Sequence, residues 1–150
     1  MRTVIQRVRH ARVEVDQQVV GQIGHGLLML VGFEPADTDD DLQWLAAKVV
    51  GLRIFDDGQG AMNLALPDVD GQVLVVSQFT LHARTKKGNR PSFVGAAPAE
   101  MALARYGQFV RTLEQALGKP VQTGQFGANM QVHLLNDGPV TIIIDTKNRE

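Results

Sequence analysis

Two short polar segments follow apolar runs and hold the residues best suited to chemistry. Ser77, Gln78 and Thr80 come after the run 73–76, and Asn136 comes after the mostly apolar run 132–135. Strands that end in such residues often deliver polar groups to the rim of a pocket. The second segment continues through Gly138-Pro139 to Thr141. Glycine reaches conformations closed to other residues, and proline fixes φ and has no N–H. An X–Pro bond is also the one peptide bond that is commonly cis.

The hydroxyl groups of Ser77 and Thr80 are candidate nucleophiles, but each needs a base within hydrogen-bond reach. His82 lies two residues beyond Thr80, which is about 7 Å along a strand. There is also no Gly-x-Ser-x-Gly elbow, so we interpret the histidines as surface or core residues. Backbone N–H groups around Gln78, Phe79 and Thr80 could instead form an oxyanion hole. A simple polar end to a strand is the alternative.

Metal and cofactor motifs are missing from the sequence. It has no cysteine, no His-Glu-x-x-His and no calcium-loop spacing, and the Asp39–Asp41 run is typical of a helix start. No glycine-rich phosphate loop is present either. We therefore predict neither a metal ion nor a cofactor.

The net charge of −1 argues against a strongly basic nucleic-acid binder, but the charges are unevenly distributed. Between residues 82 and 93 the chain carries four cations and no carboxylate: Arg84, Lys86, Lys87 and Arg90. This pattern favours a brief, local contact with an anion over a tight nucleic-acid clamp. Solvated charge on a loop explains it equally well.

Length and composition predict one domain over residues 1–150 in a cytoplasmic protein. A chain of 150 residues can bury a sizeable core, and 44% hydrophobic residues is ordinary for a globular protein. No secretion signal or membrane span of about 20 apolar residues is apparent.

The periodicity predicts a strand-rich α+β or compact α/β fold with largely antiparallel pairing, a barrel-like core and two main helices. We expect strands at residues 3–8, 12–15, 19–23, 27–33, 53–55, 73–78, 121–126, 130–135 and 141–145. The helices are expected from Thr38 or Asp39 to about Val50, and from Pro98 to about Leu117. Residues 146–150 are expected to be a frayed tail.

These segments closely resemble the D-aminoacyl-tRNA deacylases over almost the whole chain. The similar stretches include residues 5–8, 53–55, 62–64, 75–81, 90–93, 123–126, 130–132 and 136–141. His82 stands where the family usually has a tyrosine or a small residue, so we assign it no role. The resemblance implies the deacylase fold and hydrolysis of the ester between a D-amino acid and the terminal ribose of tRNA.

The resemblance also implies a homodimer with its active sites at the subunit interface. Gly138-Pro139, joined by a cis bond, would reach into the partner's site, where its carbonyl oxygens would exclude an L side chain. D-amino acids, and also glycine, would be accepted. This implies aminoacyl-tRNA as the partner and no membrane.

Two mechanisms stay open under the resemblance. Either Thr80 attacks and forms an acyl-enzyme, or water attacks with help from the ribose 2′-hydroxyl while N–H groups near Phe79 and Thr80 hold the oxyanion. We favour water, because no base is placed to activate Thr80. Ser77 and Gln78 would then shape the pocket. Met130 would be either a wall for the adenine or the amino acid or, as we favour, a core residue.

Asn136 and Thr141 would complete the pocket, and the basic loop from Arg84 to Arg90 would contact the tRNA acceptor end. The alternatives are a non-catalytic binder of tRNA ends or D-amino acids, and a small-molecule esterase or amidase that needs no RNA.

Overall fold

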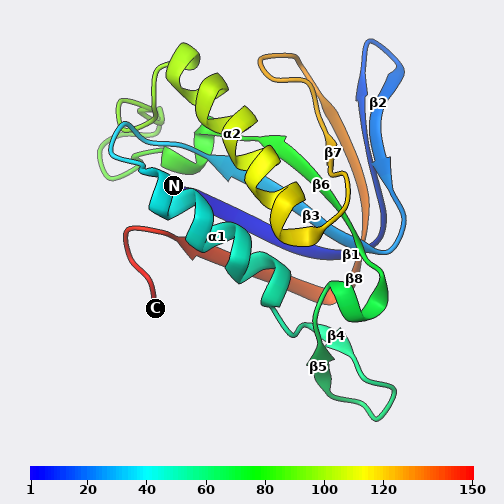
Figure 1. The fold of residues 1–150 in the computed structure, drawn as a ribbon. Helices are drawn as coiled ribbons and strands as arrows, with labels where there is room; N and C mark the ends of the chain where they lie inside the picture. Colours follow the sequence, from blue (N-terminus) through cyan, green and yellow to red (C-terminus); the bar gives the residue numbers. More distant parts are fainter.

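A computed structural model describes residues 1–150 as strands with two α-helices (Figure 1). The strands are β1 (Arg2–Val15), β2 (Gln18–Ile23), β3 (Gly26–Gly32), β4 (Phe55–Asp56), β5 (Met62–Leu64), β6 (Gln72–Ser77), β7 (Gln122–Thr123) and β8 (Gln131–Asp145). The helices are α1 (Asp39–Gly51) and α2 (Ala99–Leu117), with two short 3₁₀ helices, η1 (Pro67–Val69) and η2 (Phe79–His82). Neither α-helix is long and apolar enough to cross a membrane.

One six-stranded sheet organises the molecule, in the order β2-β1-β3-β6-β7 with β8 along the other edge of β1. β1 pairs antiparallel with β2, β3 and β8, whereas β3–β6 and β6–β7 are parallel. The short β4–β5 hairpin extends below this sheet in Figure 1. The predicted α+β class with two main helices is confirmed.

The sheet curls until its two ends almost meet, which gives the barrel-like core. β2 and β7 approach each other at Gly21, where an added Cβ would lie 2.2 Å from the Thr123 carbonyl oxygen. Only glycine permits this approach of two backbones. The near-closure therefore depends on Gly21.

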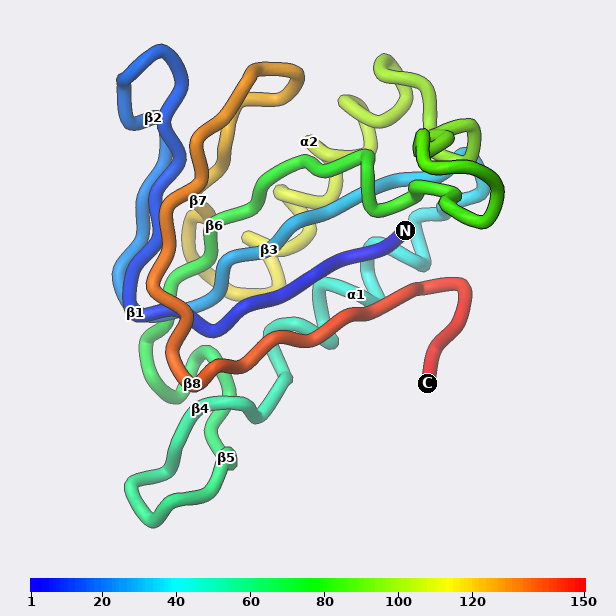
Figure 2. Tube along the Cα trace, turned by 180° about the vertical axis from the view of Figure 1, so that it is seen from behind, coloured from blue at the N-terminus to red at the C-terminus, as the bar shows by residue number.

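Apolar side chains cover both faces of β3, as its almost unbroken apolar run predicts. Leu27, Met29 and Val31 belong to the larger core cluster beneath α1 and α2, while Leu28 belongs to a second cluster on the opposite face. Figure 2, seen from behind, shows the sheet in front of the two helices. Both helices therefore cover one face, and the curled sheet encloses the other.

The helix ends follow their sequence signals. Thr38 caps α1 in a reciprocal capping box with Asp41, and Gly118 ends α2 with a left-handed φ of 76°. Pro98 is the N-cap of α2, so the helix begins one residue later than expected. These boundaries agree closely with the prediction.

Several strand boundaries differ from the prediction. The expected strands at 3–8 and 12–15 are one continuous strand, β1, and those at 130–135 and 141–145 are joined in β8. Long pairing between β1 and β8 holds both together across irregular register. β6 ends at Ser77, and the chain then turns into η2 instead of extending through Gln78.

Residues 146–150, expected to be a frayed tail, make several contacts with the rest of the chain. Thr146 is buried, and Lys147 Nζ donates to an Asp41 carboxylate oxygen at 2.6 Å. The Arg149 guanidinium lies 4.4 Å from the centre of the Trp44 ring. Charged side chains of this C-terminal segment therefore contact α1, which the polar composition of residues 146–150 did not predict.

Candidate functional site

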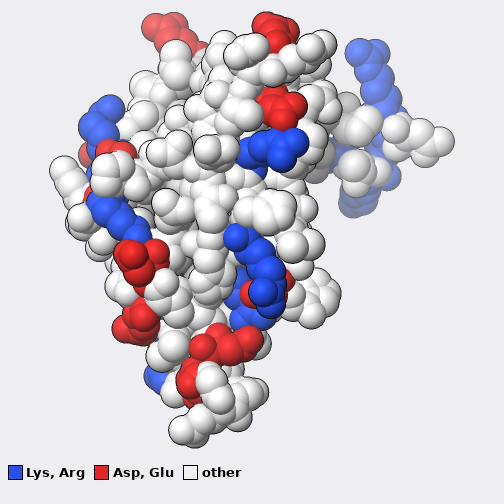
Figure 3. All heavy atoms as spheres, turned by 90° about the vertical axis from the view of Figure 1, so that its right-hand side faces the viewer, with Lys and Arg blue, Asp and Glu red and all other residues white.

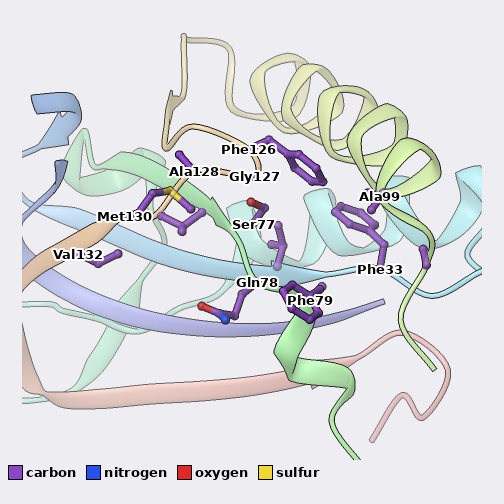
Figure 4. Close-up of a pocket in the computed structure, with 15 residues that line it drawn as sticks. Phe33, Ser77, Gln78, Phe79, Ala99, Phe126, Gly127, Ala128, Met130 and Val132 are labelled. Atoms are coloured by element: carbon purple, nitrogen blue, oxygen red, sulfur yellow. The ribbon is translucent and has the colours of Figure 1, made fainter. Parts of the chain in front are cut away.

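A cavity of about 530 Å³ opens where β3 and β6 end (Figure 4). These strands are parallel, so their carboxyl ends meet at one edge of the sheet. The N-terminal end of α2 and the segment before β8 complete the walls. Ligands of α/β sheets commonly bind in this position, outside the carboxyl ends of the strands.

The cavity lining is mostly apolar and contains no titratable side chain. Phe33, Phe79 and Phe126 supply aromatic surface, and Ser77 and Gln78 are its only polar side chains. In Figure 4 the Ser77 hydroxyl points toward Phe126, whereas the Gln78 amide points away from both Phe79 and Phe126. The site therefore has no histidine or carboxylate to act as a general base.

Thr80 lies outside the cavity lining, on the exposed first turn of η2. Its hydroxyl accepts a hydrogen bond from the Gln78 side-chain amide. His82 cannot serve it, because its side chain is 5% exposed and its Nε2 has no hydrogen-bond partner. The imidazole fills the space beside Gly32, where an added Cβ would lie 3.1 Å from the ring.

The backbone at the start of η2 presents unpaired donors beside the cavity. The backbone N–H of Gln78 donates to the Val31 carbonyl at 2.7 Å, and this hydrogen bond fixes the end of β6. The next two N–H groups, of Phe79 and Thr80, begin the 3₁₀ helix and have no partner within it. No side chain caps them. They are thus free to receive an anionic oxygen.

Met130 lies in the cavity wall and also packs against the smaller core cluster, so both interpretations of this residue describe part of its surroundings. An added Cβ on Gly124 would lie 2.7 Å from its sulfur, so the missing side chain at Gly124 makes room for Met130. Phe126 in the opposite wall rests on Tyr106 of α2, with ring centres 5.9 Å apart. Both side chains of the cavity wall therefore pack against core residues.

Asn136 and Thr141, predicted to complete the pocket, lie outside the cavity lining of their own subunit. The Asn136 side chain accepts the Val140 N–H at 2.9 Å and donates to the Thr141 hydroxyl at 3.2 Å. These bonds close a loop that contains Gly138-Pro139, whose peptide bond is cis. Both polar residues thus hold the loop together.

The Gly138-Pro139 loop is a bulge in β8. Val8 of β1 pairs with Asn136 and Gln6 pairs with Thr141, so four residues of β8 stand opposite Arg7 alone. The extra residues project from the sheet, and Gly138 and Pro139 are both exposed. They lie outside the cavity of their own subunit.

Arg7 anchors this loop and was not among the predicted site residues. Its side chain is buried, its Nε donates to the Asp137 carbonyl at 2.8 Å, and its Nη1 donates to the Ile54 carbonyl at 2.6 Å. A buried arginine is rare unless it is paired. The only feature of the sequence that could have indicated this role is the position of an arginine within a strand whose other inward-facing residues are mostly apolar.

The predicted basic residues all lie on one exposed loop after η2: Arg84, Lys86, Lys87 and Arg90. None of them takes part in an ion pair within the chain. Two backbone hydrogen bonds between Arg84 and Ser92, of 2.8 and 3.0 Å, close the loop. In Figure 3 basic side chains project at the upper right without acidic neighbours, whereas the two signs intermingle elsewhere on that face.

Comparison with known proteins gives a consistent result. The family model for D-Tyr-tRNA(Tyr) deacylase matches residues 4–145. A D-aminoacyl-tRNA deacylase from Parabacteroides distasonis is 57% identical over 150 residues, covering all of both chains. One from Dechloromonas aromatica is 56% identical over 147 residues, covering 98% of each chain.

Solved structures have the same fold. The structure of a c-Myc DNA unwinding element binding protein aligns with a TM-score of 0.89 and 38% identity, covering 97% of this chain and 98% of the other. A probable eukaryotic D-amino acid tRNA deacylase aligns with a TM-score of 0.81 and 18% identity, covering 95% and 97%. The family match and the full-length relatives together show that this chain belongs to the D-Tyr-tRNA(Tyr) deacylase family.

Proposed function

We propose that this hydrolase cleaves the ester between a D-amino acid and the 3′-terminal ribose of tRNA, in the cytoplasm, and so removes D-amino acids before translation uses them. The observation that carries the proposal is the pairing of an apolar cavity that lacks titratable side chains with the two uncapped N–H groups of η2. An aminoacyl ester is already reactive, so a site without a strong base suffices for its hydrolysis.

In the proposed reaction a water molecule attacks the ester carbonyl. The N–H groups of Phe79 and Thr80 hold the oxyanion of the tetrahedral intermediate. The ribose 2′-hydroxyl accepts a proton from the attacking water and passes its own to the departing 3′-oxygen. The carbon–oxygen ester bond then breaks, which releases the free amino acid and a tRNA with a free 3′-hydroxyl.

The hydrogen bond from Gln78 to Thr80 favours water over Thr80 as the nucleophile. The Thr80 hydroxyl has no base beside it, and a threonine needs one to attack an ester. Thr80→Val keeps the backbone N–H while removing the hydroxyl. We expect turnover of D-tyrosyl-tRNA to stay within about tenfold of the parent. A loss of several thousandfold with unchanged binding would instead identify Thr80 as the nucleophile.

Exclusion of L-amino acids is assigned to Gly138-Pro139 of a second subunit. Four apolar side chains of β8 are 36–74% exposed: Val132, Leu134, Leu135 and Ile143. Such a row on one strand is typical of a protein interface. Val132 also lines the cavity, so a second copy on this face would reach the cavity mouth. A symmetric dimer would bring each projecting loop to its partner's cavity.

Rigid backbone carbonyls at that position would clash with an L side chain and leave room for a D residue. Glycyl-tRNA, which has no side chain to exclude, should therefore also be hydrolysed. The acid-free loop from Arg84 to Arg90 would contact the phosphates of the acceptor end.

The first experiment follows matched D- and L-tyrosyl-tRNA with catalytic amounts of the protein. Multiple turnover of the D ester alone supports the proposal. Loss of both esters would retain a hydrolase but reject the chiral gate. Loss of neither, with retained binding, would identify a binder of tRNA ends.

A mixed dimer tests whether the gate acts across the interface. One subunit carries Ala99→Phe, which fills its own cavity, and the other carries Gly138→Ala. An added Cβ on Gly138 would lie 2.8 Å from Val140, and its φ is 145°, so this substitution displaces the loop. The one open cavity would then face an intact gate from its partner, and rejection of L-tyrosyl-tRNA should persist. Loss of rejection would place the gate in the same subunit.

A further inference from the structure

An exposed aromatic pair stands at the mouth of the cavity. Phe79 is 54% exposed and Phe93 is 37% exposed, and their ring centres lie 5.1 Å apart in an edge-to-face arrangement. Phe79 lines the cavity, whereas Phe93 does not. The pair therefore continues the aromatic surface of the cavity outward by one ring.

The basic loop begins and ends beside this pair. Phe93 directly follows Ser92, which is joined to Arg84 by two backbone hydrogen bonds. The Arg84 guanidinium in turn lies next to Gly95, two residues beyond Phe93. No acidic residue occurs from Gln78 to Ala99. The aromatic rings thus lie within a local field that favours an anion.

We propose that Phe93, supported by Phe79, stacks on the base of the unpaired nucleotide that precedes the terminal adenosine of tRNA. This inference rests on the proposed function, since it assumes that the aminoacyl-adenosine occupies the cavity. Aromatic surface beside unpaired cations is the combination by which proteins hold single-stranded nucleic acid. Stacking needs only the flat face of the base, so one platform suits every tRNA.

The charges favour this occupant over an apolar protein partner. A protein interface is depleted in charge at its centre, whereas the segment that joins these two phenylalanines carries four cations and no acidic residue. The phosphates on either side of the stacked nucleotide would meet the loop from Arg84 to Arg90. Stacking thus positions the base, and the cations of the loop attract the phosphates.

The test combines a protein variant with a modified substrate. The substrates are D-tyrosylated acceptor-stem RNAs, one intact and one lacking the base of the nucleotide before the terminal adenosine. Phe93→Ala should lower kcat/KM for the intact RNA by about 5- to 100-fold. The parent enzyme should lose a similar factor on the abasic RNA, and the variant should lose nothing further there. The inference fails if Phe93→Ala does not lower kcat/KM for the intact RNA. It also fails if the variant loses a further factor in kcat/KM on the abasic RNA, so that the two effects multiply.

Two controls separate stacking from other causes. Val94→Ala removes a 75% exposed apolar side chain next to Phe93 without removing a ring, and should leave kcat/KM unchanged. An equal loss in this variant would reject stacking. Phe93→Leu keeps an apolar side chain of similar size, in case alanine disturbs the fold. Because leucine has no ring, this variant should still show most of the decrease in kcat/KM for the intact RNA.

The oligomeric state and the parent enzyme complete the test. If Phe93→Ala dissociates the protein in sedimentation and slows both RNAs equally, the pair is a subunit contact and the inference fails. Failure of the parent to hydrolyse either RNA would reject the proposed function itself, which is a separate result.

Discussion

The hydroxyl group of Tyr106 donates a 2.7 Å hydrogen bond to the carbonyl of Val75, two residues before Ser77. The same carbonyl accepts the Gly124 N–H at 3.1 Å. One buried oxygen therefore joins α2, the end of β6 and the segment that leads to Phe126 and Met130. Since these elements form the cavity walls, the contact fixes their relative positions.

Tyr106 gives a pH-dependent prediction. Burial raises its pKa to about 12, against about 10 in the unfolded chain. The folded protein thus holds this proton more tightly, so the contribution to stability is complete below pH 10 and declines as the pH rises toward 12. Because Tyr106 is the only tyrosine, tyrosinate absorbance reports its titration directly. A titration midpoint near 10 in the folded protein would contradict the prediction.

Tyr106→Phe should lower the free energy of unfolding at pH 7 by about 0.5–1.5 kcal/mol, as for one buried hydrogen bond. The loss should be modest because the Val75 carbonyl keeps its bond from Gly124. Denaturant unfolding at several pH values measures it. The difference between parent and variant should shrink between pH 10 and 12, since the parent loses its advantage there.

Asp41 links the start of α1 to the C-terminal segment. Burial alone would raise its pKa, but hydrogen bonds from Lys147 and from the N–H and hydroxyl of Thr38 outweigh this effect and lower the pKa well below its usual range. Its stabilising effect is therefore present above pH 4 and is lost as the pH falls below that value. Asp41→Asn should lower the free energy of unfolding by about 1–3 kcal/mol at pH 7.

The matched control for Asp41 is Asp40→Asn. Asp40 is exposed on the same turn and makes no side-chain hydrogen bond, so its loss should change stability by less than about 0.5 kcal/mol. Equal effects from both substitutions would show that the net charge of the first turn matters, and not the contact with Lys147. Denaturant unfolding at pH 7 and pH 3 distinguishes the two cases.

Much of the fold follows from local signals. The capping residues predicted α1, the apolar stripe predicted α2, and the unbroken apolar run predicted β3 as a strand covered on both faces. The parallel pairing of β3 with β6 was not predicted, because strand direction depends on how the intervening helix packs. The merging of segments into β1 and β8 depends on contacts between distant residues.

The cavity of a single subunit brings together only some of the predicted site residues. Ser77, Gln78 and Met130 line the cavity, but Asn136 and Thr141 stabilise a separate loop within the same subunit. The spacing of Asn136 and Thr141 predicts a polar turn, but it does not predict which cavity the turn faces. Arg7 was not predicted because its shortest hydrogen bonds go to backbone carbonyls, which leave no pattern in a sequence.

The basic loop predicts a dependence on salt. Lys86→Ala combined with Lys87→Ala should weaken binding of D-tyrosyl-tRNA and reduce the slope of log affinity against log salt by about 0.7–0.9 per lost phosphate contact. Hydrolysis of D-tyrosyl-adenosine, which has no phosphate, should be unchanged. Lys48→Ala on α1 is the control and should leave the slope as it is. An unchanged slope in the double variant would remove the loop from the tRNA interface.

Arg7 should control discrimination between D and L substrates, because it holds the loop that carries Gly138-Pro139. Its guanidinium reaches the carbonyls of Asp137 and Ile54 at once, whereas a lysine ammonium cannot reproduce this planar fork. Arg7→Lys should therefore loosen the loop and narrow the ratio of kcat/KM for D- and L-tyrosyl-tRNA by about tenfold or more. Arg9→Lys is the control, since Arg9 is exposed and contacts only the Asp137 side chain at 3.2 Å. If Arg7→Lys folds normally and keeps the parent ratio, the loop does not depend on this anchor for its position.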